Sequence, residues 1–395
     1  MMQRLLFILI IFPLFVFGRE KVEFEQEIAF QNQFCDTIPF EYVRNTIIVK
    51  VKIDGQKKRF IFDTGATSCI SDKIQERMNN TVLDTTFLTD FSGIQKQLFI
   101  VNVKELTMGR LSFENLPSAV INTESTGFVN CLDYDGIIGS NLLINCIVHI
   151  DADKKYIILT DDINKLKLVS AYQSSLIFDH QNSPYVQLSL NDKIKFNALF
   201  DSGAGDFITI SNEIYRKIIK NNLGKVLNEG YGIGAIGAFG IEKATHKKRI
   251  TCRNVKFGNA KIINFIAEVS NNTQSIIGME LADYGTITID YINKQFYFVA
   301  KQQSQQYKHQ KTLGFSFQPE PNYYSVGTVW TGTKAEKIGL KNGFQILKLD
   351  SLDISKRTLQ LDCTLLLTRP LSKEKIKITY KDDKNQIKMA ELRQQ

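Results

Sequence analysis

The chain has 395 residues, of which 43% are hydrophobic and 23% are charged, and a formal net charge of +8. These values are typical of a globular protein with a sizeable core and roughly two to four domains. Because Lys and Arg are spread along the chain and do not form one basic stripe, the charge argues against a nucleic-acid partner.

The first 18 residues have the pattern of a secretory signal peptide. Arg4 provides a basic start, residues 5–12 are apolar, and small or β-branched residues lead to Gly18. We therefore expect export, to a periplasmic or extracellular location. The alternative is an uncleaved membrane anchor, although the apolar run is near the short end for a spanning helix.

Export permits disulfides, and the cysteines are Cys35, Cys69, Cys131, Cys146, Cys252 and Cys363. Four of them fall in the first 150 residues, which permits one or two bridges there but leaves the pairing open. Their spacing matches no zinc pattern, and the histidines are scattered. We expect no metal and no organic cofactor.

Residues 37–62 alternate as strands, with a turn at Asp54-Gly55, and form a hairpin that ends at Asp63. A short polar piece follows over residues 72–80. Beyond it come a second hairpin region with its turn at Phe91-Ser92-Gly93, an apolar run over residues 135–143 and a closing strand pair. The pattern predicts a mostly β protein.

The same order of features then recurs. The sequence Asp63-Thr64-Gly65-Ala66 returns as Asp201-Ser202-Gly203-Ala204, again after an apolar strand. Tyr231-Gly232 takes the place of the first glycine-bearing turn, and an Ile-Ile-Gly run follows both copies at nearly equal spacing. Two copies in register imply two matching carboxylates.

These features resemble the lobes of a retropepsin-type aspartic protease, and two lobes in one chain resemble the bilobal pepsin arrangement. The resemblance places the first lobe over residues 19–168 and the second over residues 169–300. It implies that Asp63 and Asp201 form a catalytic dyad around a water molecule. Two carboxylates about 3 Å apart share one proton, so that one acts as base and the other as acid.

The resemblance also assigns supporting roles. Thr64 and Ser202 would hydrogen-bond across the lobe interface, and Gly65 and Gly203 would let the two loops approach closely.

The hairpins at Phe91, Ser92 and Gly93 and at Tyr231 and Gly232 occupy the position of the family's substrate-covering flaps. Whether one flap works or both do stays open, as does the alternative that these glycines only form turns.

The second copy departs from the pattern, because Gly205-Asp206 stands where the first has Thr67-Ser68. The second loop thus lacks a supporting hydroxyl. A third carboxylate near the dyad would disturb its pKa values if it pointed inward.

Residues 301–310 are polar and predict a linker. Beyond them come Leu313-Gly314-Phe315, a run from Lys334 to Gly343 and a strand from Gln345 to Leu349, and this order is similar to a PDZ domain over residues 311–395. In that family, backbone N–H groups such as those of Leu313, Gly314 and Phe315 receive the C-terminus of a peptide. The alternative is a module that only packs on the protease as a structural cap.

The sequence thus predicts an exported, monomeric aspartic endopeptidase that cuts an extended polypeptide. The alternative from another class is a catalytically inactive protein that binds peptides in the same cleft.

Overall fold

The computed structural model describes residues 33–90, 92–123, 131–233, 236–237, 239–270, 274–308 and 311–394. The segment predicted as a signal peptide and Phe91 lie outside these residues. The described chain is mostly β, and none of its helices is both long and apolar enough to cross a membrane.

The first repeat, residues 33–168, consists mostly of strands and contains one short α-helix. Its elements are β1 (Cys35–Val43), β2 (Thr46–Ile53), β3 (Gln56–Asp63), β4 (Cys69–Ser71), α1 (Asp72–Met78), β5 (Val82–Thr89), β6 (Gln95–Met108), β7 (Leu111–Ile121), β8 (Gly136–Gly139), β9 (Ile147–Asp151) and β10 (Tyr156–Thr160). The predicted turn between β2 and β3 has positive φ at Asp54 and Gly55. Ser71 caps α1 by accepting a hydrogen bond from the N–H of Ile74.

The second repeat, residues 169–308, has elements of the same kinds in the same order. They are β11 (Tyr172–Phe178), β12 (Pro184–Leu190), β13 (Ile194–Phe200), β14 (Ile208–Ser211), α2 (Asn212–Lys220), β15 (Gly224–Gly232), β16 (Ile236–Gly237), β17 (Gly240–Ile241), β18 (Thr245–Phe257), β19 (Ala260–Ser270), β20 (Ser275–Ile277), β21 (Gly285–Asp290), β22 (Gln295–Ala300) and β23 (Ser304–Gln306). The polar stretch predicted as a linker contributes β23, which pairs with β19.

The strand pairings of the first repeat recur in the second. Strand β3 pairs in parallel with β8, as β13 does with β20. Strand β4 pairs in parallel with β7, as β14 does with β19. Each repeat therefore holds the strand before its Asp-Thr/Ser-Gly loop beside its Ile-Ile-Gly strand.

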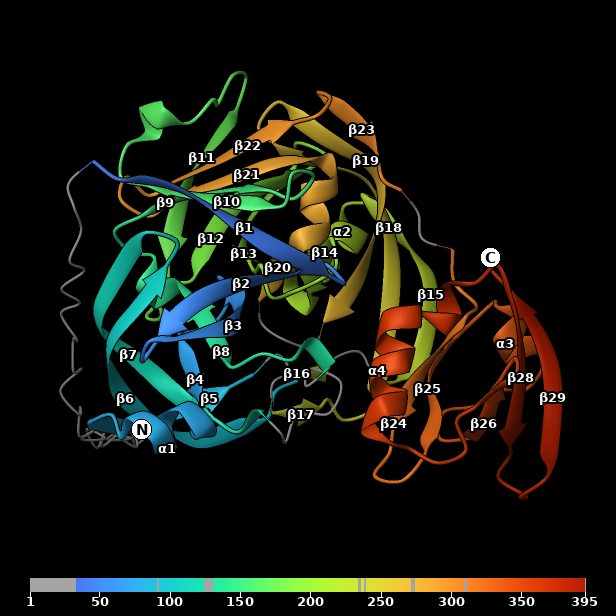
Figure 1. Ribbon diagram of the computed structural model, residues 1–395. Helices are drawn as coiled ribbons and strands as arrows, with labels where there is room; N and C mark the ends of the chain where they lie inside the picture. The colour runs from blue at the N-terminus through green and yellow to red at the C-terminus, as the bar shows by residue number, and fades with distance from the viewer. Residues whose placement is uncertain are drawn as a thin grey trace, which may run out of the picture.

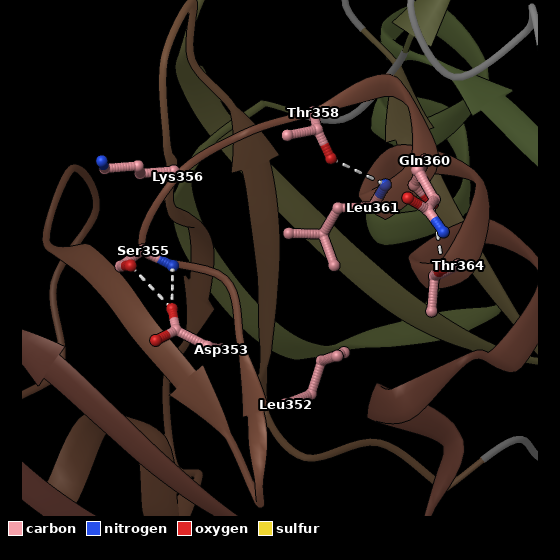
Figure 2. A pocket seen from close by; sticks show the side chains of 8 residues that line it. All are labelled: Leu352, Asp353, Ser355, Lys356, Thr358, Gln360, Leu361 and Thr364. Carbon is pink, nitrogen blue, oxygen red and sulfur yellow. Dashed lines mark hydrogen bonds between the residues drawn. The ribbon is translucent and has the colours of Figure 1, made fainter.

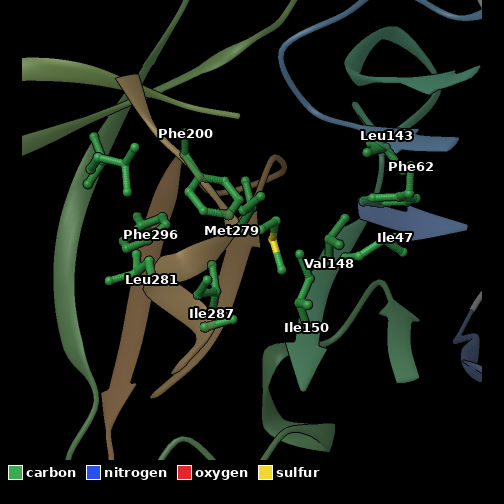
Figure 3. Packing of buried hydrophobic residues seen from close by; sticks show 14 of the residues in the cluster. Ile47, Phe62, Leu143, Val148, Ile150, Phe200, Met279, Leu281, Ile287 and Phe296 are labelled. Atoms are coloured by element: carbon green, nitrogen blue, oxygen red, sulfur yellow. The ribbon is translucent and has the colours of Figure 1, made fainter. Parts of the chain in front are cut away.

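One antiparallel sheet joins the two repeats, with neighbouring strands in the order β1, β10, β9, β21, β22 and β11 (Figure 1). At its centre Ile150 of β9 lies opposite Ile287 of β21. Side chains from both repeats pack beside this sheet, among them Phe62 and Phe200 of the strands that precede the two loops (Figure 3). Burial of this shared apolar surface stabilises the contact between the repeats.

The C-terminal unit, residues 311–394, has a hydrophobic core of its own. Its elements are β24 (Phe315–Pro319), β25 (Tyr324–Trp330), α3 (Lys334–Lys337), β26 (Gln345–Leu349), β27 (Leu352–Asp353), α4 (Leu359–Thr368), β28 (Lys375–Lys381) and β29 (Ile387–Arg393). Strand β25 pairs with β24, with β26 and, at its C-terminal end, with β15 of the second repeat.

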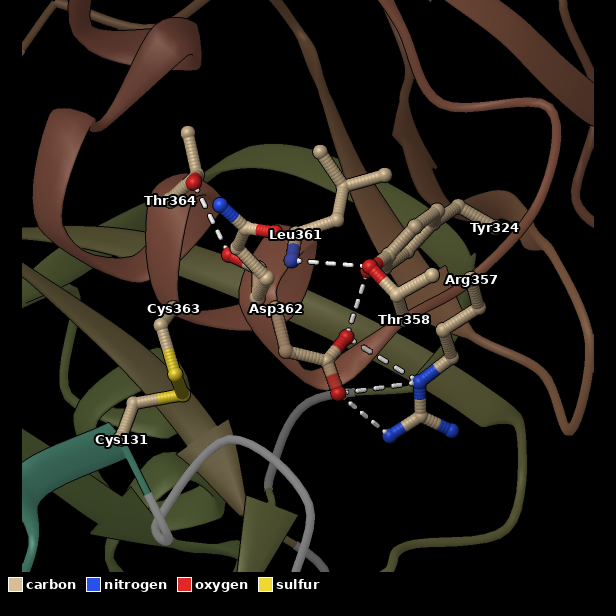
Figure 4. Close-up of a disulfide and its surroundings, with 9 residues drawn as sticks. Cys131, Tyr324, Arg357, Thr358, Leu361, Asp362, Cys363 and Thr364 are labelled. Carbon is tan, nitrogen blue, oxygen red and sulfur yellow. Dashed lines mark hydrogen bonds and ion pairs between the residues drawn. A yellow bond between two sulfur atoms is a disulfide. The ribbon is translucent and has the colours of Figure 1, made fainter.

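The disulfide of the described chain joins Cys131 of the first repeat to Cys363 of α4 (Figure 4). Among the four described cysteines before residue 150, Cys131 alone is bridged, and its partner lies outside that segment. The described cysteines that remain free are Cys35, Cys69, Cys146 and Cys252. Of these, Cys69, Cys146 and Cys252 are buried, which is common for cysteines that pack as small apolar residues.

Candidate active site

The two Asp-Thr/Ser-Gly loops meet, and each glycine lies against the carboxylate of the other loop. A Cβ atom on Gly65 would overlap the Asp201 carboxylate, and one on Gly203 would overlap the Asp63 carboxylate. Only glycine permits this approach. The structure therefore brings Asp63 and Asp201 together at the contact between the repeats.

Four reciprocal hydrogen bonds hold the loops together. The Thr64 N–H donates to Ser202 Oγ (2.9 Å), and the Ser202 N–H donates to Thr64 Oγ1 (3.0 Å). The Thr64 hydroxyl donates to the carbonyl of Phe200 (2.8 Å), and the Ser202 hydroxyl donates to that of Phe62 (2.9 Å). Both side chains are fully buried. A fully satisfied buried network of this kind fixes geometry as well as stabilising the fold.

The surroundings of the two carboxyl groups favour one shared proton. Backbone N–H groups donate to each: Gly65 to Asp63 Oδ1 (2.9 Å) and Gly203 to Asp201 Oδ1 (2.8 Å). Burial, and then repulsion by Asp201, raise the pKa of Asp63 well above its ordinary value. Burial also raises the pKa of Asp201, but a hydrogen bond from the Asp63 carboxyl opposes that rise. Both shifts favour a protonated carboxyl, so the two groups share one proton between them.

The raised pKa of Asp63 predicts how the stability of the folded protein depends on pH. Folding raises the pKa of Asp63 above 3.8, so the folded protein binds this proton more tightly than the unfolded chain. The resulting stabilisation is complete below about pH 4 and is lost as the pH rises through the raised pKa. We expect urea denaturation between about pH 4 and 8 to show a smaller loss of stability with pH in Asp63→Asn than in the parent protein. Equal slopes would contradict the shift.

Three residues that the sequence analysis did not single out support the loops. The Ser140 hydroxyl donates to the carbonyl of Thr64 (2.6 Å) and contacts the hydroxyl of Tyr291 (2.9 Å) from the other repeat. Asn45 Nδ2 donates to the carbonyl of Gly205 (2.8 Å). Ser140 directly follows the Ile-Ile-Gly run, and this position could have identified it as a supporting residue from the sequence. Nothing in the sequence links Asn45 to residue 205.

The missing hydroxyl of the second loop is replaced by a backbone carbonyl. In the first repeat Ser68 Oγ accepts a hydrogen bond from the N–H of Gly139 (3.1 Å). In the second, the carbonyl of Phe207 accepts from Gly278 (3.2 Å). Residue 206 is exposed overall, but burial of the Asp206 carboxyl raises its pKa, and Asp206 is not among the groups that shift the pKa of Asp201.

The hairpin between β5 and β6 contacts the second repeat. Ser92 and Gly93 form its turn, where the Asp90 carboxylate accepts a hydrogen bond from the Ser92 N–H (3.0 Å). The same carboxylate accepts from the N–H of Phe239 (2.6 Å), between β16 and β17. We call this the hairpin contact. The Phe239 ring packs against an apolar cluster of the first repeat that also contacts Ala66, so the hairpin contact lies near the Asp63 loop.

The sequence predicts Tyr231 and Gly232 in the turn of the second hairpin, but the structure does not place them there. They end β15, where Tyr231 lies opposite Val329 of β25. A Cβ atom on Gly232 would overlap the Gly327 carbonyl and Thr328. The chain turns back later, at the β16–β17 hairpin. The glycines of β15 therefore permit close packing of the C-terminal unit.

The residues predicted to receive a peptide terminus lie at the start of β24. Leu313 is buried, the N–H of Gly314 donates to Thr312 Oγ1 (3.3 Å), and Phe315 is the first residue of the strand. Among the described strands, β24 pairs only with β25, so its other edge is open to an added strand.

A separate pocket of about 510 Å³ lies at the start of α4 (Figure 2). It is lined by Leu352, Asp353, Ser355, Lys356, Thr358, Gln360, Leu361 and Thr364, none of which belongs to the Asp63 and Asp201 loops or to the start of β24. Among the described residues, no group of three or more His, Cys, Asp or Glu side chains could hold a metal ion.

The comparison with known proteins gives one family match, and it lies within the first repeat. No curated protein matches the chain at a significant level. Residues 49–142, which include Asp63, Ser92 and Gly139, match a family model described as aspartyl protease, and this match supports a protease.

Proposed function

We propose that the protein is an aspartic endopeptidase whose two repeats are the two lobes of a pepsin-like fold. The observation that carries the proposal is the reciprocal contact of the Asp63 and Asp201 loops through Thr64 and Ser202. Since one chain supplies both loops, the enzyme would act as a monomer. Its substrate would be an extended polypeptide bound between the lobes.

The proposed reaction needs one water molecule and the single proton of the dyad. The Asp201 carboxylate takes a proton from the water, whose oxygen attacks the carbonyl carbon of the peptide bond, while Asp63 gives its proton to the carbonyl oxygen. In the tetrahedral intermediate a proton then moves to the leaving nitrogen, and the C–N bond breaks. The products are a carboxylic acid and an amine, and no covalent acyl-enzyme forms.

We extend the proposal to the ends of the chain. The N-terminal 18 residues would direct export to the periplasm or outside the cell, an oxidising setting in which the Cys131–Cys363 bridge would persist. The C-terminal unit would act as a PDZ domain, receiving a peptide C-terminus at Leu313, Gly314 and Phe315 and adding its chain to the open edge of β24.

The proposal is tested by incubating the purified protein with a library of unfolded peptides across pH and identifying products by mass spectrometry. We expect internal cleavage that a statine-type mimic of the tetrahedral intermediate inhibits, because such a mimic places a hydroxyl between the two carboxyl groups. Binding of peptides without cleavage at any pH, by protein shown to be folded, would favour the inactive peptide-binding protein.

A further inference from the structure

In each repeat, one row of side chains lies on the same face of the sheet as the aspartate of the loop. Successive side chains of a strand point to opposite faces, so Ile61 of β3 shares a face with Asp63. Leu199 of β13 shares a face with Asp201, whose N–H extends the strand by donating to the carbonyl of Ile277 (2.9 Å). The phenylalanine between each pair packs in the shared core on the other face (Figure 3). Each row therefore lies on the side of the sheet that carries a carboxyl group of the dyad.

In the first repeat this row is apolar. Residues that lie directly opposite each other on paired strands point to the same face, so the register extends the row across the sheet. Its members are Ile61 of β3, Ile137 of β8, Cys69 of β4, Ala119 of β7 and Ile100 of β6. All five belong to one apolar cluster or pack against it. The row therefore offers an apolar surface to a substrate side chain.

In the second repeat the corresponding row ends in charged side chains. Its members are Leu199 of β13, Ile276 of β20, Thr209 of β14, Glu268 of β19 and Arg249 of β18. Each step joins strands that correspond to those of the first repeat. Glu268 thus takes the place of Ala119, and Arg249 takes the place of Ile100. The two repeats share a pattern of strand pairing but present different chemistry beside the dyad.

The cations near Glu268 are held by other groups. The Arg249 guanidinium lies over the ring of Trp330 from the C-terminal unit, 3.9 Å from the ring centroid. Its Nε is 3.6 Å from Glu268 Oε2, which is too far for a good hydrogen bond. Lys247, also on β18, donates to both carboxylate oxygens of Glu242 (2.7 and 2.6 Å). Neither cation therefore donates a hydrogen bond to Glu268.

The Glu268 carboxylate lacks the donors that such a group normally has. Among the described residues, no side chain or backbone N–H donates a hydrogen bond to it. Burial raises the pKa of Glu268, and the nearby charge of Arg249 only opposes that rise. The side chain is nevertheless 32% exposed, so an incoming group can reach it. A cation that brings its own N–H donors would satisfy the carboxylate.

We propose that Glu268 selects a lysine or arginine side chain of the polypeptide, an inference that rests on the proposed peptidase function and specifies its substrate. The ammonium or guanidinium group donates hydrogen bonds to the Glu268 carboxylate. The apolar row of the first repeat receives a hydrophobic side chain. Because successive side chains of an extended polypeptide point to opposite sides, the basic residue and the hydrophobic residue are neighbours in the substrate sequence.

The test begins with the sequences of the peptides that the protein cleaves, which should share a basic residue at one fixed position near the cut. Two versions of one such peptide are then compared, with lysine or norleucine at that position. Norleucine has a similar aliphatic chain but no amine. We expect kcat/KM to be about tenfold higher for the lysine peptide, because only lysine makes a charge-assisted hydrogen bond. Glu268→Gln should reduce this ratio to about twofold by slowing cleavage of the lysine peptide.

Two further variants complete the design. Glu213→Gln makes the same chemical change on α2, where the side chain is 72% exposed and pairs with Lys217, and it should keep the ratio of the parent protein. Arg249→Ile/Glu268→Ala gives the second row the residues that the first repeat has at these positions. This variant should favour the norleucine peptide.

Cleavage without a preference for the basic residue would overturn the role of Glu268 and leave the peptidase function intact. A preference that Glu268→Gln does not reduce would overturn it as well. If no peptide is cleaved, capture of the library by immobilised protein provides the comparison. Enrichment of basic peptides by the parent protein but not by Glu268→Gln would then support the selection and contradict the peptidase function, whereas equal capture would contradict both.

Discussion

Asp63→Asn and Asp201→Asn should each lower kcat/KM for peptide cleavage by about 10³-fold or more. Asn at position 63 cannot supply the proton that stabilises the developing oxyanion. Asn at position 201 cannot accept a proton from water. The measurement is the initial rate of cleavage of one peptide taken from the library, with product masses verified. A variant that retained more than about a tenth of the parent rate would remove the dyad assignment.

The fold should survive both changes, so loss of activity can be separated from unfolding. Asp63 shares the single proton of the dyad, and Asn has nearly the same shape as a protonated Asp and is also neutral. Asp201→Asn likewise removes charge from the buried pair, where desolvation of a charge opposes folding. The matched control is Asp206→Asn, which alters a carboxyl that is close to the same loop but is not among the groups that shift the pKa of Asp201. It should leave kcat/KM within about twofold, as is usual for surface substitutions outside a site.

The two Asp-Thr/Ser-Gly loops are the part of the structure that the sequence predicts best, because their signal is local. An apolar strand, an aspartate, a hydroxyl residue and a glycine are adjacent in the chain, and the second copy shows which residues matter. The hairpin that delivers Asp63 follows from turn residues of the same local kind, at Asp54-Gly55. Strand pairing then brings the two loops, which are far apart in the sequence, together in one site.

The contacts of the C-terminal unit could not be predicted, because each depends on a partner distant in sequence. Nothing in the alternation of β15 indicates whether its edge pairs with β25, and Gly230 and Gly232 look the same whether they form a turn or permit close packing. Disulfide connectivity likewise does not follow from spacing, so the partner of Cys131 could not be chosen from the sequence.

Thr64→Val should be the most destabilising single change among the residues that support the dyad. Valine keeps the shape of threonine but loses the hydroxyl that donates to the Phe200 carbonyl and accepts from the Ser202 N–H. Both groups would then lack a partner in a buried setting, at a cost of roughly 1–3 kcal/mol each. We expect the free energy of unfolding to fall by about 2–5 kcal/mol in urea denaturation.

The reciprocal arrangement makes a sharper test possible. Ser202→Ala removes the matching pair of hydrogen bonds, to the Phe62 carbonyl and from the Thr64 N–H. Because the two side chains belong to one network, the double variant should lose less stability than the sum of the single losses, by about 1 kcal/mol or more. Thr81→Val, at an exposed position, is the matched control and should change stability by less than about 0.5 kcal/mol. Strict additivity of Thr64→Val and Ser202→Ala would mean that the two hydroxyls act independently, and the reciprocal contact would then not be what holds Asp63 and Asp201 together.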